Sequence, residues 1–153
     1  MRIFITGASG WIGCHVTRLL VSEGHTVIGL ARNESSANVI RSLGAEVQYG
    51  TLLDLDSISV GVSRADAVIH LAYIHDLQHM SLTQKMKLFM RAVYSGIMSS
   101  VVNVMTTTDI NVIQTIGKSI KGTNKKFLMA SGTLYVVQYN TLQYSISTVV
   151  YCM

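Results

Sequence analysis

Three glycines near the start of the chain have a spacing that is typical of a phosphate-binding turn. Gly7, Gly10 and Gly13 lie in the stretch T-G-A-S-G-W-I-G at residues 6–13. The first glycine would permit a tight turn, the second a close approach of the backbone to a pyrophosphate, and the third close packing of a helix. The N-terminus of that helix would offer free N–H groups and a partial positive charge. The pattern predicts a dinucleotide-binding turn, and the alternative is a glycine-rich turn without a ligand.

The elements around this turn are those that a dinucleotide-binding unit requires. Met1 to Ile5 form a short apolar run, which predicts a buried strand. Behind the turn, apolar residues recur at helical spacing from Ile12 to Leu20, and Gly24 can end the helix. A strand, a glycine turn and a helix in this order favour nucleotide binding over the alternative.

A second feature concerns the kind of dinucleotide. The segment His25 to Ala31 predicts the next strand, and Arg32 follows it directly. An acidic residue at this position would bind the ribose 2′-hydroxyl, whereas an arginine is suited to a 2′-phosphate. We therefore expect NADP in preference to NAD, with an unliganded surface arginine as the alternative.

Three segments together resemble the extended and atypical short-chain dehydrogenases/reductases, the NAD(P)-dependent epimerase/dehydratase family. They are the glycine turn at 6–13, the segment D-A-V-I-H-L-A at 66–72 and the segment F-L-M-A-S-G-T at 127–133. The resemblance implies an α/β fold, a three-layer Rossmann-type NAD(P)-binding domain at residues 1–135. Its doubly wound parallel sheet should have the order 3-2-1-4-5, with strands near 1–6, 25–31, 45–49, 66–72 and 126–131.

The resemblance also implies which residues contact the cofactor. Thr51 stands where the family has an aspartate, which puts one hydrogen bond to adenine in question, while Leu52 can still cover the ring. His70, within the fourth strand, is expected to be a core histidine rather than a catalyst. The expected cofactor contacts are Gly7, Ser9, Gly10, Trp11, Ile12, Gly13, Arg32, Thr51, Leu52, Leu71, Ala72 and Tyr73.

The catalytic groups of the family are only partly matched. Ser131 and Thr133 follow the predicted fifth strand, where a hydroxyl would help to position a substrate, and a polar turn is the alternative. The family's Tyr-x-x-x-Lys pair is absent, because no lysine lies beyond Lys126. Three interpretations stay open: a truncated oxidoreductase or epimerase, a cofactor-binding or redox-responsive module without catalysis, and an inactive mis-spliced product. The substrate cannot be read from the sequence.

Two regions depart from the family pattern. Residues 84–105 are expected to be an insertion, with an ordinary lineage-specific helix as the alternative. A helix is expected to start at Thr108 or Asp109 and to end at Gly122, with isoleucines on its apolar face. Residues 136–153 form a tail without any charge.

Composition limits the remaining possibilities. The 153 residues are 49% hydrophobic and 13% charged, with a formal net charge of +4 and no basic cluster, so we expect no nucleic-acid partner. No apolar run of about 18 residues is present, so we expect a cytoplasmic protein without a membrane segment. His75 and His79 have the spacing of a helical pair but lack a third ligand, so no metal site is expected. The oligomeric state is left open.

Overall fold

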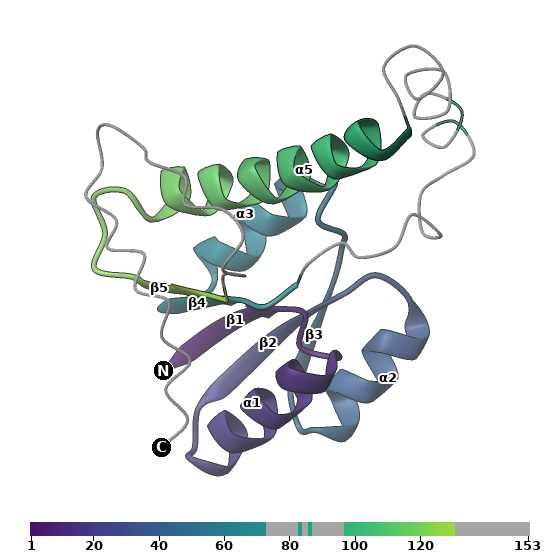
Figure 1. Cartoon of the computed structure of the whole chain (residues 1–153). Coiled ribbons are helices and arrows are strands. Elements are labelled where there is room, and N and C mark those ends of the chain that lie inside the picture. Colours follow the sequence, from purple (N-terminus) through teal and green to yellow (C-terminus); the bar gives the residue numbers. More distant parts are fainter. Residues whose placement is uncertain (73–82, 84–85, 87–96, 131–153) are drawn as a thin grey trace.

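The computed structural model describes residues 1–72, 83, 86 and 97–130. Strands and helices alternate along these residues, so that a helix lies between each strand and the next one in the chain (Figure 1). The elements are β1 (Arg2–Thr6), α1 (Trp11–Ser22), β2 (Thr26–Ala31), α2 (Glu34–Ser42), β3 (Glu46–Tyr49), α3 (Leu55–Ser63), β4 (Ala67–His70), α5 (Ile97–Ile120) and β5 (Lys126–Met129).

The sheet is parallel and has the order β3-β2-β1-β4-β5. Helices α1 and α2 cover one face, and α3 and α5 cover the other, so the domain has three layers (Figure 1). The predicted Rossmann-type fold, its doubly wound strand order and its strand positions are thus confirmed. Thr6 pairs with His70, so the carboxyl ends of β1 and β4 lie side by side. Strand order reverses between these two strands, which is where doubly wound sheets bind ligands.

The core is built from alternating side chains of strands that are buried on both faces. In β1, Ile3 and Ile5 point toward α1 and α2, whereas Phe4 points toward α3 and α5. This alternation follows from the two-residue period of a strand. On the second face, α5 contributes Val112 and Ile116, both fully buried. The three central strands β1, β2 and β4 therefore supply apolar side chains to two separate clusters, one on each face of the sheet.

Helix α5 begins at Ile97, about three turns before the predicted start. Thr108 and Asp109 lie inside the helix and do not cap it, so that prediction was wrong. Of the isoleucines expected on the apolar face, Ile116 is fully buried and Ile120 packs against the core, while Thr108 and Val112 are the other buried positions among residues 106–120. Thr and Asp are common at helix starts, but packing against α3 and the sheet overrides such local preferences. Gly122, with a φ of 76°, follows the helix end as predicted.

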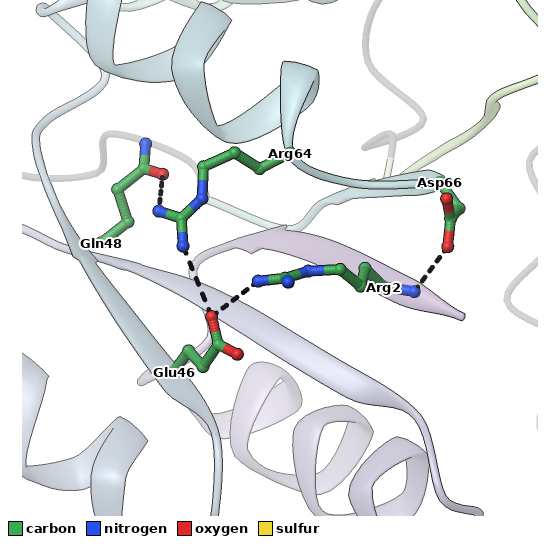
Figure 2. A network of polar contacts seen from close by, with 5 residues as sticks. All are labelled: Arg2, Glu46, Gln48, Arg64 and Asp66. Atoms are coloured by element: carbon green, nitrogen blue, oxygen red, sulfur yellow. Dashed lines mark hydrogen bonds and ion pairs between the residues drawn. The ribbon is translucent and has the colours of Figure 1, made fainter.

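A network of ion pairs lies at the amino ends of the strands (Figure 2). The Arg2 guanidinium is 2.8 Å from the Glu46 carboxylate, and the Arg64 guanidinium is 3.4 Å from the same carboxylate. The backbone N–H of Arg2 donates to Asp66 at 2.7 Å. These side chains are about half exposed, so each pair stabilises the fold by at most about 1 kcal/mol. Their charges lie at the edge of the sheet opposite to the carboxyl ends of β1 and β4.

Gly61 sets the distance between α3 and the sheet. A Cβ at this position would lie 2.4 Å from the Phe4 ring, inside van der Waals contact. We predict that Gly61→Ala lowers the free energy of unfolding, because overpacking costs about 1–3 kcal/mol. The gain in helix propensity, about 1 kcal/mol, offsets only part of this cost.

Denaturant unfolding measures the effect. The control is Val60→Ala at the neighbouring position, whose side chain is 51% exposed. This control should change the stability by about 0.5 kcal/mol or less. A Gly61→Ala protein as stable as the parent would show that Phe4 can move aside.

Candidate functional site

The turn between β1 and α1 is held against the end of β4. Gly7 has a φ of 77°, and a Cβ there would lie 2.7 Å from the backbone nitrogen of Ala72. A Cβ on Gly13 would lie 1.9 Å from the carbonyl oxygen of Gly7. Both positions therefore require glycine for reasons internal to the fold: one for conformation and approach, the other for helix packing.

Gly10 differs from these two glycines. Among the described residues, a Cβ at this position would meet only the Gly7 carbonyl oxygen, at 3.2 Å, and the residue is exposed. The fold itself does not strongly require a glycine at this position. The space above Gly10 is open to an outside group, which is what close approach of a phosphate to the backbone requires.

The N-terminus of α1 is also unlike those of the neighbouring helices. In α2 the Asn33 side chain accepts from the N–H of Ser36, and in α3 the Asp54 side chain accepts from the N–H of Ser57. The corresponding residue of α1 is Gly10, which has no side chain for capping, and the first turn contains no acidic residue. Within the described part of the chain no side chain caps the first N–H groups of this helix, and such groups at the positive helix end can bind an anion.

Two apolar side chains stand at the surface of this first turn. Trp11 is 82% exposed and Ile12 is 54% exposed. The Trp11 ring lies 5.2 Å from the ring of His15, and His15 Nδ1 lies 2.8 Å from the Trp11 carbonyl oxygen. Both predicted residues thus border the open space beside Gly10 without being part of the core.

Arg32 lies directly after β2, with an exposed side chain. Within the described part of the chain, no hydrogen bond or ion pair involves its guanidinium. The nearby carboxylate of Glu34 is instead held by Tyr49 and by Arg41, whose Nη1 lies 2.6 Å away. Hydrogen bonds from Tyr49 and then from Arg41 lower the pKa of Glu34. The basic group at this strand end is therefore free to bind an anion.

The two residues expected at the adenine lie after β3. Thr51 is exposed, and its carbonyl oxygen accepts from the N–H of Asp54 at 3.1 Å. Leu52 is partly buried and packs against the core cluster beneath α3. Leu52 therefore anchors the turn between β3 and α3 to the core, while Thr51 stays at the surface.

A buried chain of hydrogen bonds joins the ends of β1 and β4 to α5. Thr6 Oγ1 lies 2.6 Å from His70 Nδ1, and His70 Nε2 lies 3.1 Å from Asp109 Oδ1. His70 is only 2% exposed, so the expected core histidine is confirmed. Sequence reasoning missed its two partners, which lie 64 and 39 residues away and follow no motif.

Several predicted residues lie outside the described part of the chain. Tyr73, Ser131 and Thr133 belong to this group, as do His75 and His79. Among residues 1–72, 83, 86 and 97–130, no three His, Cys, Asp or Glu side chains form a group that could hold a metal ion. No helix of the described chain is both long enough and apolar enough to cross a membrane.

The sequence of the chain is similar to those of known proteins. The model of the NAD dependent epimerase/dehydratase family matches residues 3–146. An uncharacterized protein of Schizosaccharomyces pombe is 34% identical over 149 residues, which cover 97% of this chain and 43% of that protein. An uncharacterized protein of Saccharomyces cerevisiae is 36% identical over 138 residues, which cover 88% of this chain and 38% of that protein. The chain thus spans well under half of these relatives.

Solved structures agree on the fold. Yeast methylglyoxal/isovaleraldehyde reductase, complexed with NADPH, has a TM-score of 0.60 at 19% identity, covering 86% of this chain and 37% of that one. UDP-glucose-4-epimerase from Stenotrophomonas maltophila, with bound NAD, has a TM-score of 0.58 at 17% identity, covering 87% and 37%. The sequence match and the shared fold lead to one conclusion: the chain belongs to the NAD-dependent epimerase/dehydratase family.

Proposed function

We propose that this chain binds NADP(H) across the carboxyl ends of β1 and β4. The observation that carries the proposal is the first turn of α1, which has no side-chain cap and stands beside the open Gly10. A positive helix end without a side-chain cap, beside exposed backbone, is suited to a pyrophosphate. Membership of the epimerase/dehydratase family relates the chain to NAD(P)-dependent oxidoreductases and supports the same ligand.

Each part of the dinucleotide has a proposed contact. The pyrophosphate would lie against the turn and the first turn of α1, the 2′-phosphate against Arg32, and the adenine against Thr51 and Leu52. The nicotinamide ribose would lie against the end of β4. When bound, the nicotinamide supplies a hydride acceptor or donor. The contacts at the turn are Gly7, Ser9, Gly10, Trp11, Ile12 and Gly13, and those at the end of β4 are Leu71, Ala72 and Tyr73.

The choice of NADP over NAD rests on this chain's own residues. Solved neighbours of the same fold hold either cofactor, one NADPH and the other NAD. At the end of β2, Arg32 is exposed, and the acidic side chain of Glu34 is engaged by Arg41 and Tyr49. Because the Glu34 carboxylate is already hydrogen-bonded to other residues, the Arg32 guanidinium favours a phosphate over a ribose hydroxyl.

We further propose that these 153 residues form the cofactor half of an oxidoreductase without its proton donor. No tyrosine after β5 is followed four residues later by a lysine. Ser131 and Thr133 can polarise a carbonyl, but a hydroxyl of ordinary acidity does not protonate it. The activity of the longer relatives is a separate question.

Two alternatives predict different results for NADPH binding. A cofactor-binding or redox-responsive module would bind NADPH but need no substrate, and a mis-spliced product would bind nothing. The mis-spliced alternative includes the proposal that residues 84–105 are an insertion. Transcript sequencing across these codons and beyond codon 137 tests it directly, since splice signals there would identify retained intron.

The first prediction from this site concerns Arg32. Arg32→Ala should weaken NADPH binding by about one to two decades and leave NADH binding unchanged, because only NADPH carries the 2′-phosphate. Fluorescence titration with both cofactors measures this difference. Arg18→Ala, which removes an exposed arginine of α1, is the control for the change in net charge. Equal affinity of the parent for both cofactors would contradict the assignment.

The second prediction concerns Gly10. Gly10→Val should abolish NADPH binding, because a branched side chain fills the space proposed for the pyrophosphate. The fold should survive, since a Cβ at this position meets only one backbone oxygen at 3.2 Å. Circular dichroism checks that the α/β signal is retained. A folded Gly10→Val protein with undiminished binding would place the phosphates elsewhere.

The third prediction is that the chain consumes NADPH only at the background rate with aldehydes, ketones and nucleotide sugars. A positioned acid contributes about 10²–10⁴-fold to such reactions, and the 153 residues contain no Tyr-x-x-x-Lys pair to supply it. Absorbance at the NADPH band measures consumption. Saturable turnover that Ser131→Ala or Thr133→Ala removes would refute the proposed incompleteness.

A further inference from the structure

The buried hydrogen-bond chain of Thr6, His70 and Asp109 lies directly under the end of β4. We propose that these three side chains are positioning residues, which fix the backbone at Leu71 and Ala72 for the nicotinamide half of the cofactor. The inference rests on the proposed function, because it assigns a role within the same site. None of the three was expected to contact the cofactor.

The chain of hydrogen bonds has a definite direction when the imidazole is neutral. The Asp109 carboxylate can only accept, so His70 Nε2 carries the proton and donates to Oδ1 at 3.1 Å. His70 Nδ1 is then an acceptor, and the Thr6 hydroxyl donates to it at 2.6 Å. The Thr6 oxygen keeps a lone pair, which accepts from the N–H of Ala72 at 3.4 Å. Each ring nitrogen of His70 thus has one partner, while the Thr6 hydroxyl donates to one group and accepts from another.

At the point where the backbone hydrogen bonds between β1 and β4 end, the side-chain network provides the next hydrogen bond. The N–H of Leu71 still donates to the carbonyl oxygen of Thr6, at 3.0 Å, as in a regular parallel pair. The next N–H, that of Ala72, donates to the Thr6 side chain instead. The position of Ala72 therefore depends on a hydroxyl, and the direction of that hydroxyl depends on His70 and Asp109.

The same residues also reach the glycine turn. Thr6 is the last residue of β1 and directly precedes Gly7, whose missing Cβ allows Ala72 to approach. A shift at Ala72 would change the gap between the turn and β4, across which the dinucleotide is proposed to lie. Thr6 is fully buried, so water cannot replace a lost partner there. Burial also means that Thr6 and His70 act through the backbone and do not touch the cofactor.

Two pairs of variants distinguish the effect of losing a hydrogen bond from the effect of changing the shape of a side chain. Thr6→Val keeps the shape but removes the hydroxyl, whereas Thr6→Ser keeps the hydroxyl. Asp109→Leu removes the acceptor, whereas Asp109→Asn keeps an acceptor oxygen. The Asp109 side chain is 26% exposed, so variants there test the inference even if Thr6→Val does not fold.

The readout compares two ligands. NADPH spans the whole proposed site, and adenosine 2′,5′-bisphosphate occupies only the adenosine half. Thr6→Val and Asp109→Leu should weaken NADPH binding by about tenfold and leave the bisphosphate affinity unchanged. Thr6→Ser and Asp109→Asn should bind both ligands as the parent does. Calorimetric titration of the folded proteins gives both affinities.

The outcomes distinguish this inference from the proposed function. Folded Thr6→Val and Asp109→Leu proteins that bind NADPH like the parent would overturn the positioning role. Equal losses for both ligands would also overturn it, since they indicate a general loss of structure. A parent that binds neither ligand would refute the proposed function, and the positioning role with it.

Discussion

The close approach of the first turn to the end of β4 is the constraint on which the candidate site depends. Gly7 adopts a left-handed conformation, and its missing side chain leaves room for the backbone of Ala72. Gly13 allows α1 to pack onto the carbonyl of Gly7. Because these contacts involve backbone atoms, no rotamer change can relieve a clash. They fix the start of α1 over the point where the strand order reverses, which is where a parallel sheet exposes its ligand site.

The two edges of the sheet have different roles. Arginine and carboxylate side chains pair at the amino ends of the strands, where Arg2, Glu46 and Arg64 meet (Figure 2). The carboxyl ends have an uncapped helix and an unpaired Arg32 within the described chain. Arg41 and Glu34 also pair near the carboxyl ends, so the uncapped helix and Arg32, and not a lack of ion pairs, distinguish this edge. This division follows from parallel pairing, which gathers all strand ends of one kind on one side.

The family match covers residues 3–146, and the family's Tyr-x-x-x-Lys pair is absent from the 153 residues. The family match and the fold of the solved neighbours concern the half that binds the dinucleotide. The match covers 43% and 38% of the two yeast relatives, so each relative is more than twice as long as its matched part. Cofactor choice is not decided by that shared fold, because proteins of this fold hold NAD or NADPH. In the proposed site, the choice depends on the side chains after β2, chiefly Arg32.

The sequence by itself determined the fold class, the strand order, the glycine turn and the core position of His70. The glycine turn and the strand positions follow from local rules, namely glycine spacing and apolar runs, whereas the fold class and the strand order follow from the resemblance to the epimerase/dehydratase family. The start of α5 was not determined this way, because Thr108 and Asp109 look like helix caps while tertiary packing continues the helix through them. The partners of His70 were also beyond the sequence. Thr6 and Asp109 come from segments far apart in the chain, and only pairing of β1 with β4 and the position of α5 bring their polar atoms into hydrogen-bonding distance.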